Sequence, residues 1–160
     1  RRHTRYISVT GVQTCALPIW TAQAAIDDAL AYATQRTAFG EPISRRQGVT
    51  FPLVELATQI RAARLLCLEA LWRKDHGLPH AVEANMVKWW APKLSVEACH
   101  QALLTFGHTG YSDEVPAGQR LRDAIGLEIG DGTAQIAKLV VARQLLGRRS
   151  EEHTSELQSH

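Results

Sequence analysis

The chain of 160 residues lacks several features that would assign it to common functional classes. It contains no P-loop motif, no dinucleotide-binding glycine fingerprint and no G-x-S-x-G nucleophile motif. Its longest apolar runs fall short of the ~20 residues that a membrane-spanning helix needs. With 18 basic and 16 acidic residues it has no large excess of one charge, so no surface for nucleic acid is indicated. We therefore expect neither a membrane nor nucleic acid as a partner.

Cysteine is scarce, with three residues in the whole chain. Cys67 and Cys99 each lie inside an apolar helical pattern, which favours buried reduced thiols over a disulfide between them. Reduced thiols are typical of a cytoplasmic protein. His76 and His80 have a spacing that binds metal only on a helix, and Gly77 between them breaks a helix. No metal site is expected.

Both ends of the chain read as foreign sequence. Residues 149–159 are the translation of a common sequencing adapter, and residues 9–19 are what the complementary strand of that adapter encodes in frame. The alternative is that these residues are the real termini. We exclude residues 1–19 and 149–160 from fold reasoning as artefacts, and expect them to be disordered. The remaining segment, 20–148, is long enough for one domain with a core of its own.

Apolar residues in this segment recur at helical spacing, and no strand alternation exceeds a few residues. Main helices are predicted over about 21–37, 47–76 and 81–106, and after Thr133, with a short helix over 117–124. Turn residues at Gly40 and Gly77 separate the first three. Because the connections are short, the predicted fold is all-α, a four-helix up-down bundle.

The inner faces of the two longest helices follow from the same spacing. The stripe of the second helix has a period near 3.5, which is typical of long helices packed at a shallow angle. Its predicted members are Leu53, Leu56, Ile60, Ala63, Cys67, Ala70 and Leu71. Those of the third helix are Ala84, Val87, Ala91, Leu94, Ala98, Ala102 and Thr105.

A set of motifs precedes the last helix. Asp131 stands directly before Gly132-Thr133, where a loop meets that helix. The helix dipole and free N–H groups stabilise a carboxylate there, so Asp131 is either an N-cap or a base held against a ligand. The motifs are, in order, Tyr111-x-x-Glu114-x-Pro116, Arg122-Asp123-Ala124 and Asp131-Gly132-Thr133-Ala134-Gln135-Ile136.

Together with Arg36-x-x-Phe39-Gly40-x-Pro42 at the end of the first helix, these motifs resemble the C-terminal helical domain of acyl-CoA dehydrogenases. The resemblance covers essentially all of 20–148. It implies α,β-dehydrogenation of an acyl-CoA thioester, with FAD as cofactor and an electron-transfer flavoprotein as acceptor. It also implies a homo-oligomer, either a dimer or a tetramer. The family needs an N-terminal helical domain and a middle β-domain as well, so this chain alone is expected to be inactive.

The resemblance assigns the catalytic base to Asp131. In the family, the carboxylate before Gly-Thr removes the α-proton of the thioester. Most members carry Glu at this position, and the Asp of this chain is shorter by one methylene, or about 1.5 Å. The alternatives are that the active site is repacked around the shorter base, or that the base lies on the first helix before residue 20, as in some members.

The resemblance also assigns FAD contacts. Arg36, Phe39 and Gln47 match residues that contact the FAD of a neighbouring subunit, with the arginine fork on the pyrophosphate. His108 lies in a Gly-rich turn at a position where a second glycine is common, and is either a polar contact to FAD or an ordinary turn histidine. Leu104 replaces a glutamine that often contacts the adenosine part.

Three further residues are assigned near the start and the end of the last helix. Thr133 and Gln135 match positions that reach FAD, and Arg143 matches an arginine near the CoA end of the substrate channel. Helix capping, a solvated glutamine and a surface arginine are the simpler explanations. Rival functions on the same scaffold are an acyl-CoA oxidase, a flavin monooxygenase or a non-catalytic helical scaffold.

Overall fold

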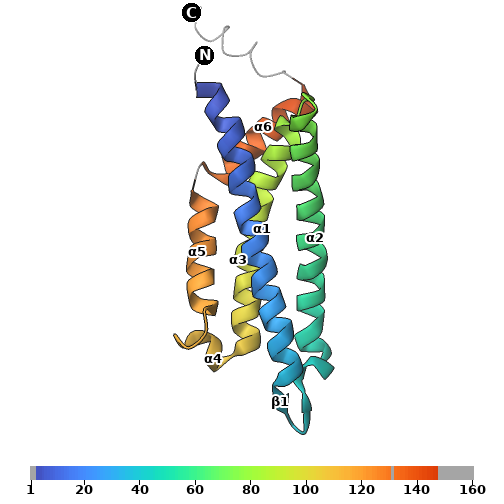
Figure 1. Ribbon diagram of the computed structural model, residues 1–160, viewed down its shortest axis with the longest axis vertical. Coiled ribbons are helices and arrows are strands. Elements are labelled where there is room, and N and C mark those ends of the chain that lie inside the picture. The colour runs from blue at the N-terminus through green and yellow to red at the C-terminus, as the bar shows by residue number, and fades with distance from the viewer. Residues whose placement is uncertain (1–2, 131, 148–160) are drawn as a thin grey trace, which may run out of the picture.

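The computed structural model describes residues 3–130 and 132–147, with side chains from residue 16 onward. It is an all-α molecule, as predicted, with one short hairpin that was not predicted, and its long helices run side by side along one axis (Figure 1). The helix α3 packs against α1, α2, α5 and α6, and so forms the centre of the bundle. The elements are α1 (His3–Gln35), β1 (Thr37–Ala38), β2 (Glu41–Pro42), η1 (Ile43–Arg45), α2 (Gln47–Asp75), α3 (Ala81–Phe106), α4 (His108–Tyr111), α5 (Ala117–Ile129) and α6 (Ala134–Leu146).

The buried residues confirm the predicted inner stripes. On α2, Leu53, Ile60 and Ala63 are fully buried, while Leu71 at the end of the stripe is half-buried. On α3, Val87 and Leu94 are buried, whereas the end positions of the stripe are half-buried. Burial of each large aliphatic side chain contributes about 1.5–3 kcal/mol. Small alanines between them allow close helix approach.

The helix α1 begins much earlier than predicted. Disorder was expected over 1–19, and the structure instead continues α1 back to His3. Ile19 is buried, because it extends the apolar stripe of Ala22 and Ile26 by one turn. Pro18 is also fully buried. The adapter origin of this segment remains a prediction, and residues 149–160 lie outside the described part of the chain.

The helix α5 is longer than the predicted 117–124. Gly126 does not stop it, and the helix continues to Ile129. Gly130 ends it, donating its N–H to the carbonyl of Gly126 at 3.0 Å. An ion pair between Arg120 and Asp28 joins α5 to α1 across the bundle. In the part of the chain that the structure describes, no helix is long and apolar enough to cross a membrane.

Candidate active site

The hairpin that follows α1 forms one end of the molecule (Figure 1). Its register pairs Thr37 with Pro42 and Ala38 with Glu41, which leaves Phe39 and Gly40 as a two-residue turn. Both turn residues have positive φ, 55° and 84°. Gly40 adopts this conformation without strain, but for a phenylalanine it costs about 1–3 kcal/mol. Phe39 is also 92% exposed. The two-residue hairpin turn itself requires positive φ at both positions, so the turn explains the backbone conformation, while the exposure of the ring leaves it available to a ligand.

Arg36 is fixed through its backbone while its side chain is free. Its N–H donates to the carbonyl of Tyr32 at 2.8 Å, and its carbonyl accepts from Ile43 at 2.9 Å. Its guanidinium is exposed and has no hydrogen-bond or ion-pair partner among the described residues. The alternative that this side chain satisfies terminal carbonyls of α1 is therefore not observed.

Gln47 and Arg46 complete this end. Gln47 is exposed at the first position of α2, where backbone N–H groups have no partner inside the helix. The guanidinium carbon of Arg46 lies 5.1 Å from the centroid of the Phe39 ring, within the range of a cation–π contact. Sequence reasoning missed Arg46, although its position directly before Gln47 was a usable signal. The three arginines 36, 45 and 46 make this end cationic and suited to a phosphate-bearing ligand.

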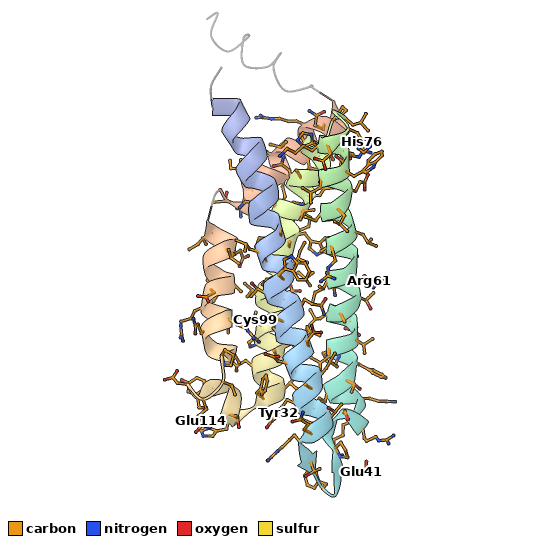
Figure 2. All side chains as sticks on the ribbon, in the orientation of Figure 1. Tyr32, Glu41, Arg61, His76, Cys99 and Glu114 are labelled. Atoms are coloured by element: carbon orange, nitrogen blue, oxygen red, sulfur yellow. The ribbon has the colours of Figure 1, made fainter. Side chains whose placement is uncertain are left out.

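The Gly-rich turn after α3 lies at the same end. The rings of Tyr32, near the end of α1, and Phe106, the last residue of α3, have centroids 4.6 Å apart. His108 follows two residues later, is exposed and opens α4. Figure 2 places Tyr32 near this end, together with the labelled Glu41 and Glu114, and His76 at the opposite end. The structure therefore brings His108 to the same end as Arg36, Phe39 and Gln47.

Glycine is favoured at two positions of this turn for different reasons. Gly107 has φ 63°, which favours glycine, and a Cβ there would meet nothing within 4 Å. Open space at Gly107 allows a ligand to approach the backbone. At Gly110 a Cβ would lie 2.7 Å from both the Leu103 carbonyl oxygen and the Phe106 Cβ. Gly110 is therefore required by close packing of α4 against the end of α3.

The junction between α5 and α6 carries the other predicted residues. Asp131, the predicted base, lies outside the described residues. Gly132 has φ 100°, which favours glycine. Thr133 is the N-cap residue of α6, but its side chain makes no capping hydrogen bond. Its hydroxyl is exposed and remains available to a ligand, as is the exposed Gln135 in the first turn.

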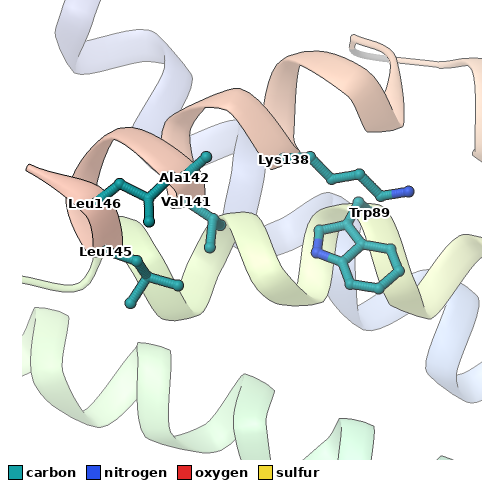
Figure 3. A pocket seen from close by; sticks show the side chains of 6 residues that line it. All are labelled: Trp89, Lys138, Val141, Ala142, Leu145 and Leu146. Atoms are coloured by element: carbon teal, nitrogen blue, oxygen red, sulfur yellow. The ribbon is translucent and has the colours of Figure 1, made fainter. Parts of the chain in front are cut away.

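Arg143 lies exposed in the last turn of α6, where a cation also interacts favourably with the helix dipole. Next to it, α6 and α3 enclose a mostly apolar groove of ≈ 360 Å³ (Figure 3). The ammonium of Lys138 lies 4.6 Å from the centroid of the Trp89 ring in this groove. The groove is lined by Trp89, Lys138, Val141, Ala142, Leu145 and Leu146.

The two groups of predicted residues do not meet within one copy of the chain. The helix α5 connects the α4 end to the α6 junction, and its 13 residues span about 20 Å. Arg36, Phe39, Gln47 and His108 lie at one end, and Thr133, Gln135 and Arg143 lie beyond the other end of α5. A single ligand can touch both groups only if it is very long or if two subunits contribute.

Comparison with known proteins gives the family. Residues 4–146 match the model of the acyl-CoA dehydrogenase C-terminal domain. A probable acyl-CoA dehydrogenase, YngJ of Bacillus subtilis, is 44% identical over 135 residues, which is 84% of this chain and 36% of that protein. The chain belongs to the acyl-CoA dehydrogenase family and forms its C-terminal helical domain.

Solved structures agree. Butyryl-CoA dehydrogenase from Megasphaera elsdenii superposes with a TM-score of 0.85 at 33% identity, covering 88% of this chain and 37% of that one. A structure of PigA with FAD and proline superposes with a TM-score of 0.84 at 25% identity, covering 87% and 36%. The chain thus spans about a third of the length of the relatives that it matches.

Proposed function

We propose that the full-length protein containing this chain is an FAD-dependent acyl-CoA dehydrogenase that introduces an α,β double bond into an acyl-CoA thioester, as a step of fatty acid metabolism. Family membership and the likeness to butyryl-CoA dehydrogenase support this reaction. The observation that carries the proposal is that side chains available to a ligand are found at both ends of one bundle. In a flavoprotein whose subunits share FAD sites, the hairpin end and the α6 end of one subunit belong to different active sites.

The hairpin end fits a dinucleotide. Arg36 has a free guanidinium, Phe39 is an exposed ring on a strained turn, and Gln47 is exposed at a helix N-terminus. A planar guanidinium suits phosphate oxygens, an exposed ring suits a flat heterocycle, and Gly107 leaves room for a close approach. We assign Arg36, Phe39, Gln47 and His108 to the FAD held by a neighbouring subunit. The PigA structure with FAD supports this choice of cofactor.

The residues at the α6 end are the ones that we assign to the reaction itself. We assign proton abstraction at the α-carbon to Asp131, FAD contacts to Thr133 and Gln135, and the CoA end of the substrate channel to Arg143. Bound FAD supplies hydride acceptance from the β-carbon. The unused hydroxyl of Thr133, exposed at the start of α6, supports a ligand-binding role for this junction. A positioned carboxylate with a pKa near the working pH is the group that such a proton transfer requires.

A second copy of this chain is the partner that we propose for the outer face of α2. This face carries exposed residues at alternating spacings of three and four, as in a coiled-coil seam. Its charges are self-complementary. If two copies of α2 pack antiparallel about a two-fold axis midway between Thr58 and Arg61, then Arg61 of one copy lies within one turn of Glu55 of the other. Neither Arg61 nor Glu55 has an ion-pair partner among the described residues. The seam consists of Phe51, Val54, Thr58, Arg61, Leu65, Leu68 and Trp72.

The remaining partner is an electron acceptor. We propose an electron-transfer flavoprotein in a cytoplasmic, homo-oligomeric enzyme, either a dimer or a tetramer. The buried free thiols of Cys67 and Cys99 support a reducing compartment. The likeness to PigA with FAD and proline favours one alternative, a flavoenzyme on the same scaffold that acts on a substrate other than acyl-CoA. An acyl-CoA oxidase is the other rival.

Anaerobic addition of acyl-CoA to the full-length protein tests the proposal. We expect the bound flavin to lose its oxidised absorbance, and to recover it with an electron-transfer flavoprotein much faster than with oxygen. Fast recovery with oxygen would show an oxidase, and absence of flavin would show a scaffold. The 160-residue chain is the control, which should be colourless and inactive, because it spans only about a third of the length of the relatives that it matches.

A further inference from the structure

A lysine in the middle of the bundle holds the loop that precedes α6. The ammonium of Lys88, on α3, donates to the carbonyl oxygen of Gly130 at 3.0 Å, across 42 residues of sequence. Lys88 is half-buried and takes part in no ion pair among the described residues. Lysine normally keeps its ammonium in water, so a half-buried lysine aimed at one main-chain oxygen indicates a specific task.

The contact closes a helix end that is otherwise incomplete. Gly130 is the C-cap of α5, with ψ 150°, and its own N–H is already bonded to Gly126. Its carbonyl points out of the helix, where such groups need a partner from outside. A cationic donor gives a hydrogen bond of about twice the ordinary strength.

The neighbouring residue of α3 holds the other side of the same loop. Trp89 lies under the ammonium of Lys138, which belongs to the second turn of α6. Ala124 of α5 and Ala137 of α6 are both buried, so both helices are seated on the bundle. Two consecutive residues of α3 thus anchor the end of α5 and the start of α6 on either side of the junction.

Covalent geometry carries this restraint to the next residue. A peptide unit is planar, so the carbonyl oxygen of Gly130 belongs to the same rigid group as the amide that follows it. The residue that follows in sequence is Asp131. Misplacement of a reacting group by 1 Å costs about 100-fold in rate. A short base with one fewer methylene than glutamate has less freedom to correct such an error.

We propose that Lys88 is a positioning residue for the catalytic base, acting through the main-chain oxygen of Gly130. The proposal rests on the proposed function, because it takes Asp131 as the base. Lys88 touches neither substrate nor cofactor in this role. It holds the main-chain oxygen that leads directly into Asp131 in the sequence.

Steady-state kinetics of the full-length protein test this role. We expect Lys88→Met to lower kcat by about tenfold or more, with KM within about twofold and full FAD content. Lys88→Arg keeps a cationic donor and should recover most of the rate. The control is Lys93→Met, on the same helix, whose ammonium is exposed and pairs only with Glu97 at 3.7 Å. A Lys88→Met enzyme with kcat unchanged, or one that loses FAD and stability instead, would overturn the proposal.

A double-mutant cycle separates this proposal from the function on which it rests. If Lys88 acts through the base, Lys88→Met should add little to the loss already caused by Asp131→Asn, because residues that act as a unit are non-additive. Full additivity shows an independent structural effect and overturns the positioning role. Unchanged turnover in Asp131→Asn itself shows that the base is elsewhere, and both assignments then fail.

Discussion

Burial raises the pKa of both core thiols above the ordinary value of 9.0. For Cys99 burial is the largest effect, and the hydrogen bond with Ser95 and the charge of Arg120 partly oppose it. Both cysteines are free and buried, as the sequence predicted. Because each thiol stays protonated in the folded state at a pH where the unfolded chain has lost the proton, the folded state binds more protons above pH 9.0.

The free energy of unfolding should therefore fall as the pH rises through 9.0 and above, and this thiol contribution is fully present below that pH. We expect a Cys67→Ala/Cys99→Ala variant to be less stable at neutral pH, because cavities are created, but to lose less stability between about pH 8 and 10. Urea unfolding at both pH values measures this difference. Equal losses in the two proteins would show that other groups cause the alkaline destabilisation.

At the residue scale, the sequence offered candidate residues but not their conformation. Arg36, Phe39 and Gln47 were assigned as FAD contacts from the family resemblance, and that assignment stays a prediction, whereas the positive φ of Phe39 and its contact with Arg46 were not foreseen. Both depend on the hairpin register, which two-residue strands do not reveal in sequence. The Lys88 contact with Gly130 was also invisible, because it joins residues that only the packed bundle brings together.

At the scale of elements, α2 shows two faces with the same periodicity. Its inner stripe, from Leu53 to Ala70, faces the core, and its outer seam, from Phe51 to Trp72, is exposed. The stripe and the seam lie on opposite sides of α2, and only the inner stripe is covered by the rest of this chain. The boundaries of α2 and α3 were predicted to within a residue or so, because their stop signals are local. The start of α1 and the end of α5 were not, because packing decided them.

Charge substitution in the outer seam should separate copies of the protein. We expect Leu65→Glu to lower the association state of the full-length protein in sedimentation, because it places a charge in an apolar interface. Ile125→Glu, on the exposed side of α5, is the matched control and should change nothing. Arg61→Glu should weaken association, and Glu55→Arg in the same chain should restore it. Persistence of the oligomer in both Leu65→Glu and Arg61→Glu would place the interface elsewhere.

At the scale of the whole molecule, the length of the bundle keeps two groups of candidate site residues apart. The hairpin end presents a free arginine and an exposed ring, and the α6 end presents the loop with the predicted base and an unused threonine hydroxyl. The all-α fold followed from sequence. That the residues form two groups about 20 Å apart did not, because it depends on the direction of α5.

The most direct test of the account is the rate of flavin reduction in the full-length protein when Asp131 is replaced by Asn and acyl-CoA is added without oxygen. The account predicts a loss of several orders of magnitude in that rate, with FAD content unchanged, because the amide cannot accept the α-proton. Reduction at the unaltered rate would contradict it and would move the base to the first helix of the domain.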